Sequence, residues 1–404
     1  MAKRVMLVLG WFWPVLLFAQ CLFQSHQISF PGTVQWVHFS PASWKDNASP
    51  LSHAIVELED RLLFYDGSGQ VSKEVSKGKG GIFTVSKQGR YLVVFERVKE
   101  ATPAEPGLDR YLVYDHKGQL LWSKEEQKIH DLPEPVGFVY ISDLDGTAIF
   151  VYDYRRTIEF YDRTGRLIRT VHAPIDPYFE GDVSRDGRYF GFVTGRRGKV
   201  WLALYSSHGD SLWQQPFPGE KIKGHLLLNP DASRIVVSAY HFKRVQGKRK
   251  HRLVGKTLVF NRSGGLLRSL PIYFSKAAFS GNNQYLILAH KESVHLVRLR
   301  DGQILFSKEN FLRAHEPNRD CELRSVSAAP TGQFFLLGCS QANTQGPWSP
   351  KIFLLDRPGR VICSREFPKR FVSPTFPDFA QLSADGRMLA VVFKNSIEVY
   401  RINR

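Results

Sequence analysis

The stretch Ser184-Arg-Asp-Gly-Arg-Tyr-Phe-Gly-Phe-Val193 carries the pattern that decides the fold. A polar turn of the Ser-x-Asp-Gly-Arg type leads directly into an apolar strand, and a short apolar segment precedes it. Because Asp-Gly turns suit tight hairpins, the stretch predicts two antiparallel strands. Close copies are Ser86-Lys-Gln-Gly-Arg-Tyr-Leu-Val-Val-Phe95 and Ser383-Ala-Asp-Gly-Arg-Met-Leu-Ala-Val-Val392, and weaker copies start at Ser142, Asn229, Ser280 and Ala329.

A second phrase, a strand ending in an Asp-x-x-Gly turn, follows the first after a gap. It reads Tyr161-Asp-Arg-Thr-Gly-Arg-Leu-Ile168, Tyr114-Asp-His-Lys-Gly-Gln-Leu-Leu-Trp122 and Leu355-Asp-Arg-Pro-Gly-Arg-Val-Ile362. The two phrases together form a repeat of about 40–50 residues that contains only strands. Such a repeat is typical of a β-propeller, which overrides the two or three domains that 404 residues would otherwise suggest.

The number of repeats predicts the number of blades. In a four-stranded blade, strands a to d run from the axis outward, so the first phrase fits the a–b hairpin and the second fits the c–d hairpin. The chain offers eight candidate a strands: Val34–Ser40, Ile82–Ser86, Gly137–Ser142, Gly181–Ser184, His225–Asn229, Lys276–Ser280, Ser325–Ala329 and Phe379–Ser383.

The last repeat ends with a c strand, Ser396–Ile402, and no d strand follows it. We expect the segment near His26–Phe30 to supply that strand, which would remove exposed sheet edges. The prediction is therefore an all-β protein with one propeller of eight four-stranded blades, closed by an N-terminal strand. The alternative is seven blades with Gln27–Ser76 as an irregular partial blade, because the link Pro41–Ser52 is long and lacks Asp-Gly.

These phrases carry a family resemblance over nearly the whole mature chain. The Ser-x-Asp-Gly-Arg turn resembles the a–b turn of WD40-type repeats, and Tyr114–Trp122 resembles the blade signature of quinoprotein-like (PQQ-like) propellers. The resemblance implies an architecture and no particular activity, since such blades occur in scaffolds and enzymes alike. Quinoproteins of this class often carry adjacent cysteines under the quinone. This chain has no Cys-Cys pair, so we expect no cofactor.

The N-terminus has the form of a targeting signal. Lys3 and Arg4 precede an apolar run from Val5 to Ala19, which is short for a transmembrane helix and suits a secretory signal. We expect residues 1–19 to be a signal peptide and residues 20–404 to form the propeller, exported to a periplasm or to the extracellular space. An uncleaved anchor and a lipoprotein acylated at Cys21 are the alternatives, although Gln20 is large for a lipobox.

The four cysteines suit an exported protein, which can hold disulfides. Cys321 and Cys339 flank the predicted hairpin turn Pro330–Gly332, so we predict that they form a disulfide across it. The alternative is a pair of small buried residues. Cys21 and Cys363 are the other two, and no Cys-x-x-Cys occurs to support a zinc or thioredoxin-like site.

The chain is strongly basic, with a formal net charge of +17. The variable b–c and d–a loops share one face of a propeller, and we place the binding surface there. One b–c segment, His241–Lys256, has basic side chains without any acidic one. The predicted binding residues are Lys243, Arg244, Lys248, Arg249, Lys250, Arg252 and Lys256, extended by Arg196 and Arg197 of the preceding blade.

Such a segment suits an anionic polymer, a lipid headgroup or an acidic protein. Nucleic acid is disfavoured as a partner because exported proteins meet little of it, and we expect a monomer. The plainer alternative is a solvated hairpin whose lysines prevent edge-to-edge aggregation.

Catalytic patterns are weak in the sequence. It has no Gly-x-Ser-x-Gly elbow and no metal-binding histidine pair, and Asp143-Leu-Asp145-Gly146 is too short of oxygen ligands for a calcium loop. A non-enzymatic binding or scaffold module is therefore expected. The alternative is a glycosidase-type or lyase-type propeller whose carboxylates converge at the channel mouth. Its candidate carboxylates are Glu134, Asp176, Glu180, Glu316, Asp320 and Asp378.

Overall fold

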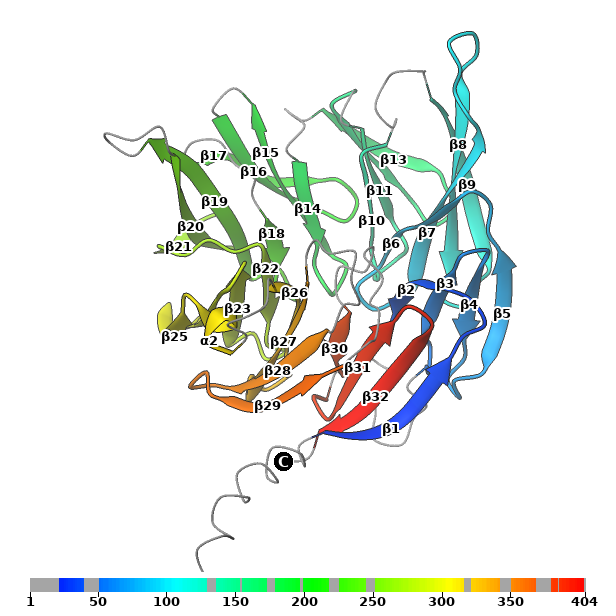
Figure 1. The fold of residues 1–404 in the computed structure, drawn as a ribbon. Coiled ribbons are helices and arrows are strands. Elements are labelled where there is room, and N and C mark those ends of the chain that lie inside the picture. Colours follow the sequence, from blue (N-terminus) through cyan, green and yellow to red (C-terminus); the bar gives the residue numbers. More distant parts are fainter. Residues whose placement is uncertain are drawn as a thin grey trace, which may run out of the picture. The chain divides into compact units, whose positions relative to one another are not determined.

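The protein is an eight-bladed β-propeller in which every blade is a four-stranded antiparallel sheet (Figure 1). The computed structural model describes residues 22–39, 51–128, 136–152, 155–172, 179–196, 199–217, 225–244, 251–315, 321–341, 350–367, 379–383 and 385–402. The chain divides into two compact units, residues 36–43 with 51–275, and residues 1–35 and 44–50 with 276–404.

The first unit holds the first five blades. They comprise β2 (Val34–His38), β3 (Ile55–Leu58), β4 (Arg61–Tyr65) and β5 (Val71–Ser76); β6 (Gly80–Val85), β7 (Tyr91–Lys99), β8 (Gly107–Asp115) and β9 (Leu120–Lys128); β10 (Phe138–Ile141), β11 (Ala148–Tyr152), β12 (Thr157–Tyr161) and β13 (Leu167–His172); β14 (Phe179–Val183), β15 (Tyr189–Arg196), β16 (Lys199–Ser206) and β17 (Ser211–Phe217); and β18 (Leu226–Leu228), β19 (Arg234–Arg244), β20 (His251–Asn261) and β21 (Leu266–Leu270). The first blade is complete, so the seven-blade alternative is wrong.

The second unit holds the last three blades and, among its described residues, a short helix, α2 (Phe311–His315). The blades comprise β22 (Lys276–Phe279), β23 (Tyr285–His290), β24 (Ser293–Arg298) and β25 (Gln303–Lys308); β26 (Cys321–Ala328), β27 (Phe334–Gln341), β28 (Lys351–Asp356) and β29 (Val361–Glu366); and β30 (Ala380–Leu382), β31 (Met388–Phe393), β32 (Ser396–Ile402) and β1 (Leu22–Ser29).

The N-terminal strand closes the last blade, as predicted. β1 pairs antiparallel with β32, from Leu22 opposite Ile402 to Ser29 opposite Ser396. Two further backbone bonds continue the pairing beyond the strand, from Phe30 N to the Asn395 carbonyl (2.9 Å) and from Val34 N to the Lys394 carbonyl (2.6 Å). The strand begins earlier than the predicted His26 because the hydrogen-bonded ladder continues to Leu22.

Side-chain hydrogen bonds explain why both turn phrases recur. In the a–b turn, the buried Ser184 hydroxyl donates to Asp186 (2.6 Å) and accepts from Tyr189 N (3.0 Å). In the c–d turn, Asp162 Oδ1 accepts from Thr164 N (2.9 Å) and Arg166 N (3.0 Å). Gly165 follows with φ of 84°, a left-handed conformation that glycine adopts without steric cost.

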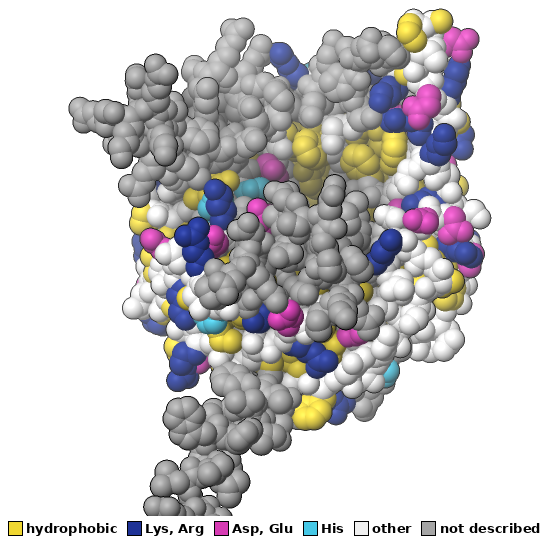
Figure 2. Space-filling view, viewed as in Figure 1, with side chains coloured by type: hydrophobic (Ala, Val, Ile, Leu, Met, Phe, Trp, Pro, Cys, Tyr) yellow, Lys and Arg dark blue, Asp and Glu magenta, His cyan; other side chains and the backbone are white. Residues whose placement is uncertain are grey.

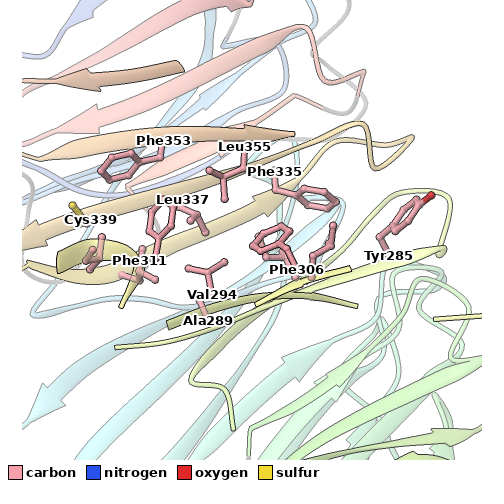
Figure 3. Packing of buried hydrophobic residues seen from close by; sticks show 14 residues of the cluster. Tyr285, Ala289, Val294, Phe306, Phe311, Phe335, Leu337, Cys339, Phe353 and Leu355 are labelled. Atoms are coloured by element: carbon pink, nitrogen blue, oxygen red, sulfur yellow. The ribbon is translucent and has the colours of Figure 1, made fainter. Parts of the chain in front are cut away.

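The hydrophobic core lies between successive blades and is built from their middle strands. All five residues of β11 are buried, whereas the outer strand β5 is mostly exposed. In the second unit, Ile287 and Leu296 of the sixth blade pack in one cluster with Phe335, Leu337 and Phe353 of the seventh (Figure 3). Burial on both faces explains why these strands read as continuous apolar runs.

The described parts of the long loops are shorter than the sequence suggests, because the strands continue into them. In the second blade the b–c connection is mostly hairpin, since β7 runs to Lys99 and β8 starts at Gly107. The segment His241–Lys256 also begins and ends in strand, up to Arg244 and from His251. Continued strand pairing satisfies backbone groups that an irregular loop would leave to water.

Candidate functional site

The predicted basic residues lie at the b–c ends of the fourth and fifth blades. Backbone pairing places Lys243 opposite Arg252 and Arg244 opposite His251 at the end of the β19–β20 hairpin. In the preceding blade, Arg196 lies opposite Lys199. Lys256 pairs with Ala239 farther down the same hairpin. Lys248, Arg249, Lys250 and Arg197 lie outside the described residues, so their role stays a prediction.

Like charges at directly opposed positions of an antiparallel pair destabilise it. The register sets Lys or Arg opposite Lys or Arg at two positions, Lys243 with Arg252 in β19–β20 and Arg196 with Lys199 in β15–β16. The chain supplies no acidic residue between His241 and Lys256 to offset the charge.

The β7–β8 hairpin offers a contrast within the same unit. Arg97 Nε lies 2.9 Å from Asp109 Oδ1 and its guanidinium 3.6 Å from Glu100, while Lys99 pairs with Glu105. At its base, Arg110 lies 2.8 Å from Glu125. Figure 2 shows basic and acidic side chains next to one another at the tip of this hairpin. This projection neutralises its own charge, so it is not a candidate anion site.

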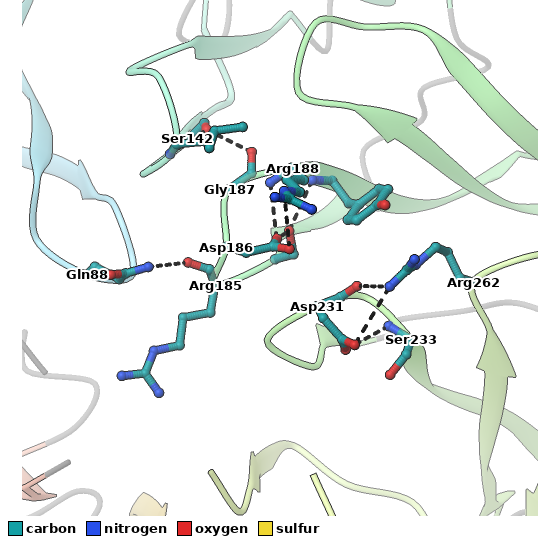
Figure 4. A network of polar contacts seen from close by, with 12 residues as sticks. Gln88, Ser142, Arg185, Asp186, Gly187, Arg188, Asp231, Ser233 and Arg262 are labelled. Carbon is teal, nitrogen blue, oxygen red and sulfur yellow. Dashed lines mark hydrogen bonds and ion pairs between the residues drawn. The ribbon is translucent and has the colours of Figure 1, made fainter. Parts of the chain in front are cut away.

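The a–b turns are occupied by contacts between blades (Figure 4). Ser142 Oγ donates to the Gly187 carbonyl (2.7 Å), and Gln88 Nε2 donates to the Arg185 carbonyl (2.8 Å). The Asp143 carboxylate accepts a hydrogen bond from Gln88 N (2.7 Å), so it stabilises the a–b turn of the second blade. Among the described residues, no three His, Cys, Asp or Glu side chains gather as a metal site requires.

One carboxylate of the predicted acidic set lies in the described part of the chain. Glu180 is in β14, and its Oε1 lies 3.8 Å from Nδ1 of His225, which immediately precedes β18. Burial raises the pKa of Glu180 to about 7, and the nearby Asp182 contributes in the same direction. The side chain is still 46% exposed, so it is surrounded by protein but reachable from solvent. Glu134, Asp176, Glu316, Asp320 and Asp378 lie outside the described residues.

Asp182, two residues along the same strand, has a structural role. Its Oδ2 accepts from Lys87 Nζ and from Leu228 N, each at 2.7 Å, and so joins the second, fourth and fifth blades. Sequence reasoning listed Glu180 but missed Asp182 and His225. Glu180 and Asp182 are two residues apart, so they lie on the same face of a strand, and this spacing indicates Asp182 once Glu180 is a candidate. No local sequence pattern indicates His225.

Within the described ranges, no helix has the length and apolar character needed to cross a membrane. No protein-family model matches the chain, and no curated protein matches it.

The chain resembles solved structures of β-propellers, including a WD40 domain. The C-terminal WD40 domain of Sif2 matches with a TM-score of 0.59 and 12% identity, covering 95% of this chain and 99% of that one. The Dos1 propeller matches with 0.56 and 12%, covering 94% and 95%. The Cps50 (Swd1) propeller of Myceliophteria thermophila matches with 0.51 and 12%, covering 95% and 100%. At such identities the likeness shows the fold alone, which is the β-propeller fold also found in a WD40 domain.

Proposed function

We propose that the protein is an exported, non-enzymatic binding module that holds an anionic partner, an acidic protein or an anionic polymer, on its loop-rich face. The observation that carries the proposal is the set of opposed basic residues, Lys243 with Arg252, Arg244 with His251 and Arg196 with Lys199. The fold supports it, because WD40-type propellers commonly serve as binding scaffolds. Export rests on the N-terminal signal pattern.

The contact is expected to be electrostatic. Adjacent basic hairpins create a local positive potential that attracts anions and weakens as salt screens it, with a Debye length of about 8 Å at physiological ionic strength. The same potential would act on a polysaccharide sulfate, an acidic protein segment or an anionic membrane surface. The experiment therefore has to separate these partners.

The test compares the mature protein with a variant in which Lys248, Arg249, Lys250 and Arg252 are changed to Ser. Binding is measured by biolayer interferometry to heparin, to an acidic polypeptide such as poly-Glu, and to vesicles with and without an anionic lipid. The matched control removes four exposed basic residues from c–d turns and an outer strand, changing Lys73, Lys117, Arg163 and Arg300 to Ser.

Binding that is at least tenfold weaker in the first variant and unchanged in the control supports the proposal. Equal losses in both variants would mean that only net charge matters, and no loss in the first would move the interface elsewhere. The class of probe that binds identifies the chemistry of the partner.

A second candidate function has one observation in its favour. Glu180, with its pKa near 7 and His225 at 3.8 Å, has the protonation behaviour of a general acid or base for a glycosidase-type or lyase-type reaction on carbohydrate. Release of reducing ends from a panel of polysaccharides, lost in Glu180→Gln, would favour this reading. An inactive wild-type protein across the panel would leave the binding module standing.

A further inference from the structure

Two cysteines in the second unit are disulfide-bonded. Cys339 lies in β27 and Cys363 in β29, and both side chains are buried, with exposed fractions of 0% and 2%. The chain has four cysteines in all. Within one chain, three pairings are compatible with both being bonded: Cys339 with Cys363; Cys339 with Cys321 and Cys363 with Cys21; or Cys339 with Cys21 and Cys363 with Cys321.

The strand register excludes a bond between Cys339 and Cys363. Cys339 is opposite Lys351 in β28, and Lys351 is opposite Glu366 in β29, three residues from Cys363. Two strand spacings of about 4.8 Å and three residue rises of about 3.3 Å put the two Cα atoms roughly 14 Å apart. Cα atoms more than about 7 Å apart cannot be bridged without moving the backbone.

The register also excludes Cys321 as the partner of Cys363. Cys321 begins β26, which pairs with β27, so β27 and β28 both separate it from β29. Three strand spacings alone amount to about 14 Å. By contrast, Cys321 is opposite Gln341, two residues from Cys339 and on the same face of the ladder. This diagonal is the shortest approach open to Cys321, and a bulge between Leu323 and Ser325 allows local adjustment.

We infer that Cys339 is bonded to Cys321 and Cys363 to Cys21. The first bond is the hairpin disulfide expected from the sequence. The second one is new: Cys21 lies outside the described residues, but it directly precedes β1, the outer strand of the last blade, while Cys363 lies in β29, the outer strand of the seventh. This disulfide covalently links the closing strand β1 to the seventh blade.

Both disulfides form by thiol–disulfide exchange, in which a disulfide donor is the oxidant. In each bond, two thiols lose two protons and one electron pair through two exchange steps, and the donor disulfide becomes a dithiol. Such donors belong to export compartments. The bond also decides the fate of Cys21, because a sulfur joined to Cys363 cannot carry a lipid thioether. Residue 21 must then remain in the mature chain, as cleavage before Gln20 would leave it.

The Cys21–Cys363 disulfide keeps the closing strand β1 attached to the propeller. Among the described residues, β1 is held to the blade by its ladder with β32 and by the backbone bonds that continue this ladder, and the middle of β1, Phe23–Gln27, is exposed. A closing strand that can detach exposes two sheet edges and invites exchange between molecules. With the Cys21–Cys363 disulfide in place, β1 stays attached to the seventh blade when its ladder with β32 opens. It can then pair again with β32 of the same molecule.

Tryptic mapping tests the inference, because each cysteine falls on its own peptide. The peptides are the mature N-terminus to Lys45, residues 320–324, residues 325–351 and residues 361–365. The protein is taken from the exported fraction, alkylated, digested without reductant and analysed by mass spectrometry. We expect residues 320–324 linked to 325–351, and 361–365 linked to the peptide that ends at Lys45.

Any other linkage overturns the inference, as does alkylated or acylated Cys21 in the folded protein. Two variants sharpen the result. Cys363→Ser should render Cys21 alkylatable and leave the 320–324 link in place, whereas Cys339→Ser should free Cys321 and leave the 361–365 link in place. Loss of both links in either variant would contradict two independent bonds.

Discussion

Lys77 and Glu57 form a buried ion pair: Nζ lies 2.7 Å from Oε1, and the two side chains are 5% and 7% exposed. Glu57 Oε1 also accepts from Ile82 N at 3.2 Å, which ties the first blade to the inner strand of the second. The pair follows from neither turn phrase, and it shows how contacts between blades fix the position of each repeat relative to the next.

Removing Lys77 should destabilise the protein strongly. Lys77→Ala leaves the Glu57 carboxylate buried without its cation, which typically costs about 3–5 kcal/mol. Urea unfolding followed by tryptophan fluorescence measures the loss. Lys73→Ala, on the exposed strand β5, is the control and should change the stability by no more than about 0.5 kcal/mol. Equal effects of the two substitutions would contradict the importance of the pair.

Gly187 should not tolerate a side chain. Its φ is 74°, and a Cβ would lie 2.5 Å from Leu144 N and 2.6 Å from Ser142 Oγ. Gly187→Ala is therefore expected to cost about 1–3 kcal/mol or more, from strain and from displacement of the neighbouring turn. Gly32→Ala, where no heavy atom lies within 4 Å of the added Cβ, is the control and should leave the melting temperature nearly unchanged.

Relieving the repulsion in the basic hairpin should stabilise the fold and weaken binding. Arg252→Thr removes a charge directly opposite Lys243, with an expected gain of about 0.2–1 kcal/mol in unfolding free energy and a loss of affinity for the anionic probe. Lys256→Thr removes an equal charge opposite Ala239 and should give no such gain. Differential scanning fluorimetry at low salt is the measurement. A destabilised Arg252→Thr would show that the hairpin uses its charge structurally.

Glu180 should make stability depend on pH in a definite direction. Its folded-state pKa of about 7 is above the ordinary value of 4.5, so the protonated form is favoured in the folded protein. The stability that it contributes is fully present below about pH 4.5 and is lost as the pH rises through 7.

Glu180→Gln should therefore gain stability relative to wild type at pH 8 but not at pH 4.5. The difference is expected to be about 1 kcal/mol, because the half-exposed side chain is screened by solvent. Urea titrations at the two pH values check it, with the exposed Glu59→Gln as control. A Glu180→Gln effect that is the same at both pH values would refute the shifted pKa.

The sequence by itself determined the blade count, the eight inner strands, both hairpin turns and the closing strand. These features depend on local chemistry: Asp162 bonds amides two and four residues ahead, and Ser184 bonds one five residues ahead. Because these bonds join residues a few positions apart, they require particular residue types at fixed spacings, and the sequence shows this pattern. The predicted b–c segment His241–Lys256 was too long as a loop, because strand pairing continues through charged residues such as Lys243 and Arg244.

Only the tertiary structure decided which distant residues meet. His225 lies beside Glu180 from the next blade, and Lys77 lies beside Glu57 from a strand twenty residues earlier. The register alone puts Lys243 opposite Arg252 and keeps Cys339 away from Cys363. The physical reason is that strand register and the packing of blades are set by the whole ladder of backbone bonds and by buried apolar surfaces, so no local run of residues records which partners they bring together.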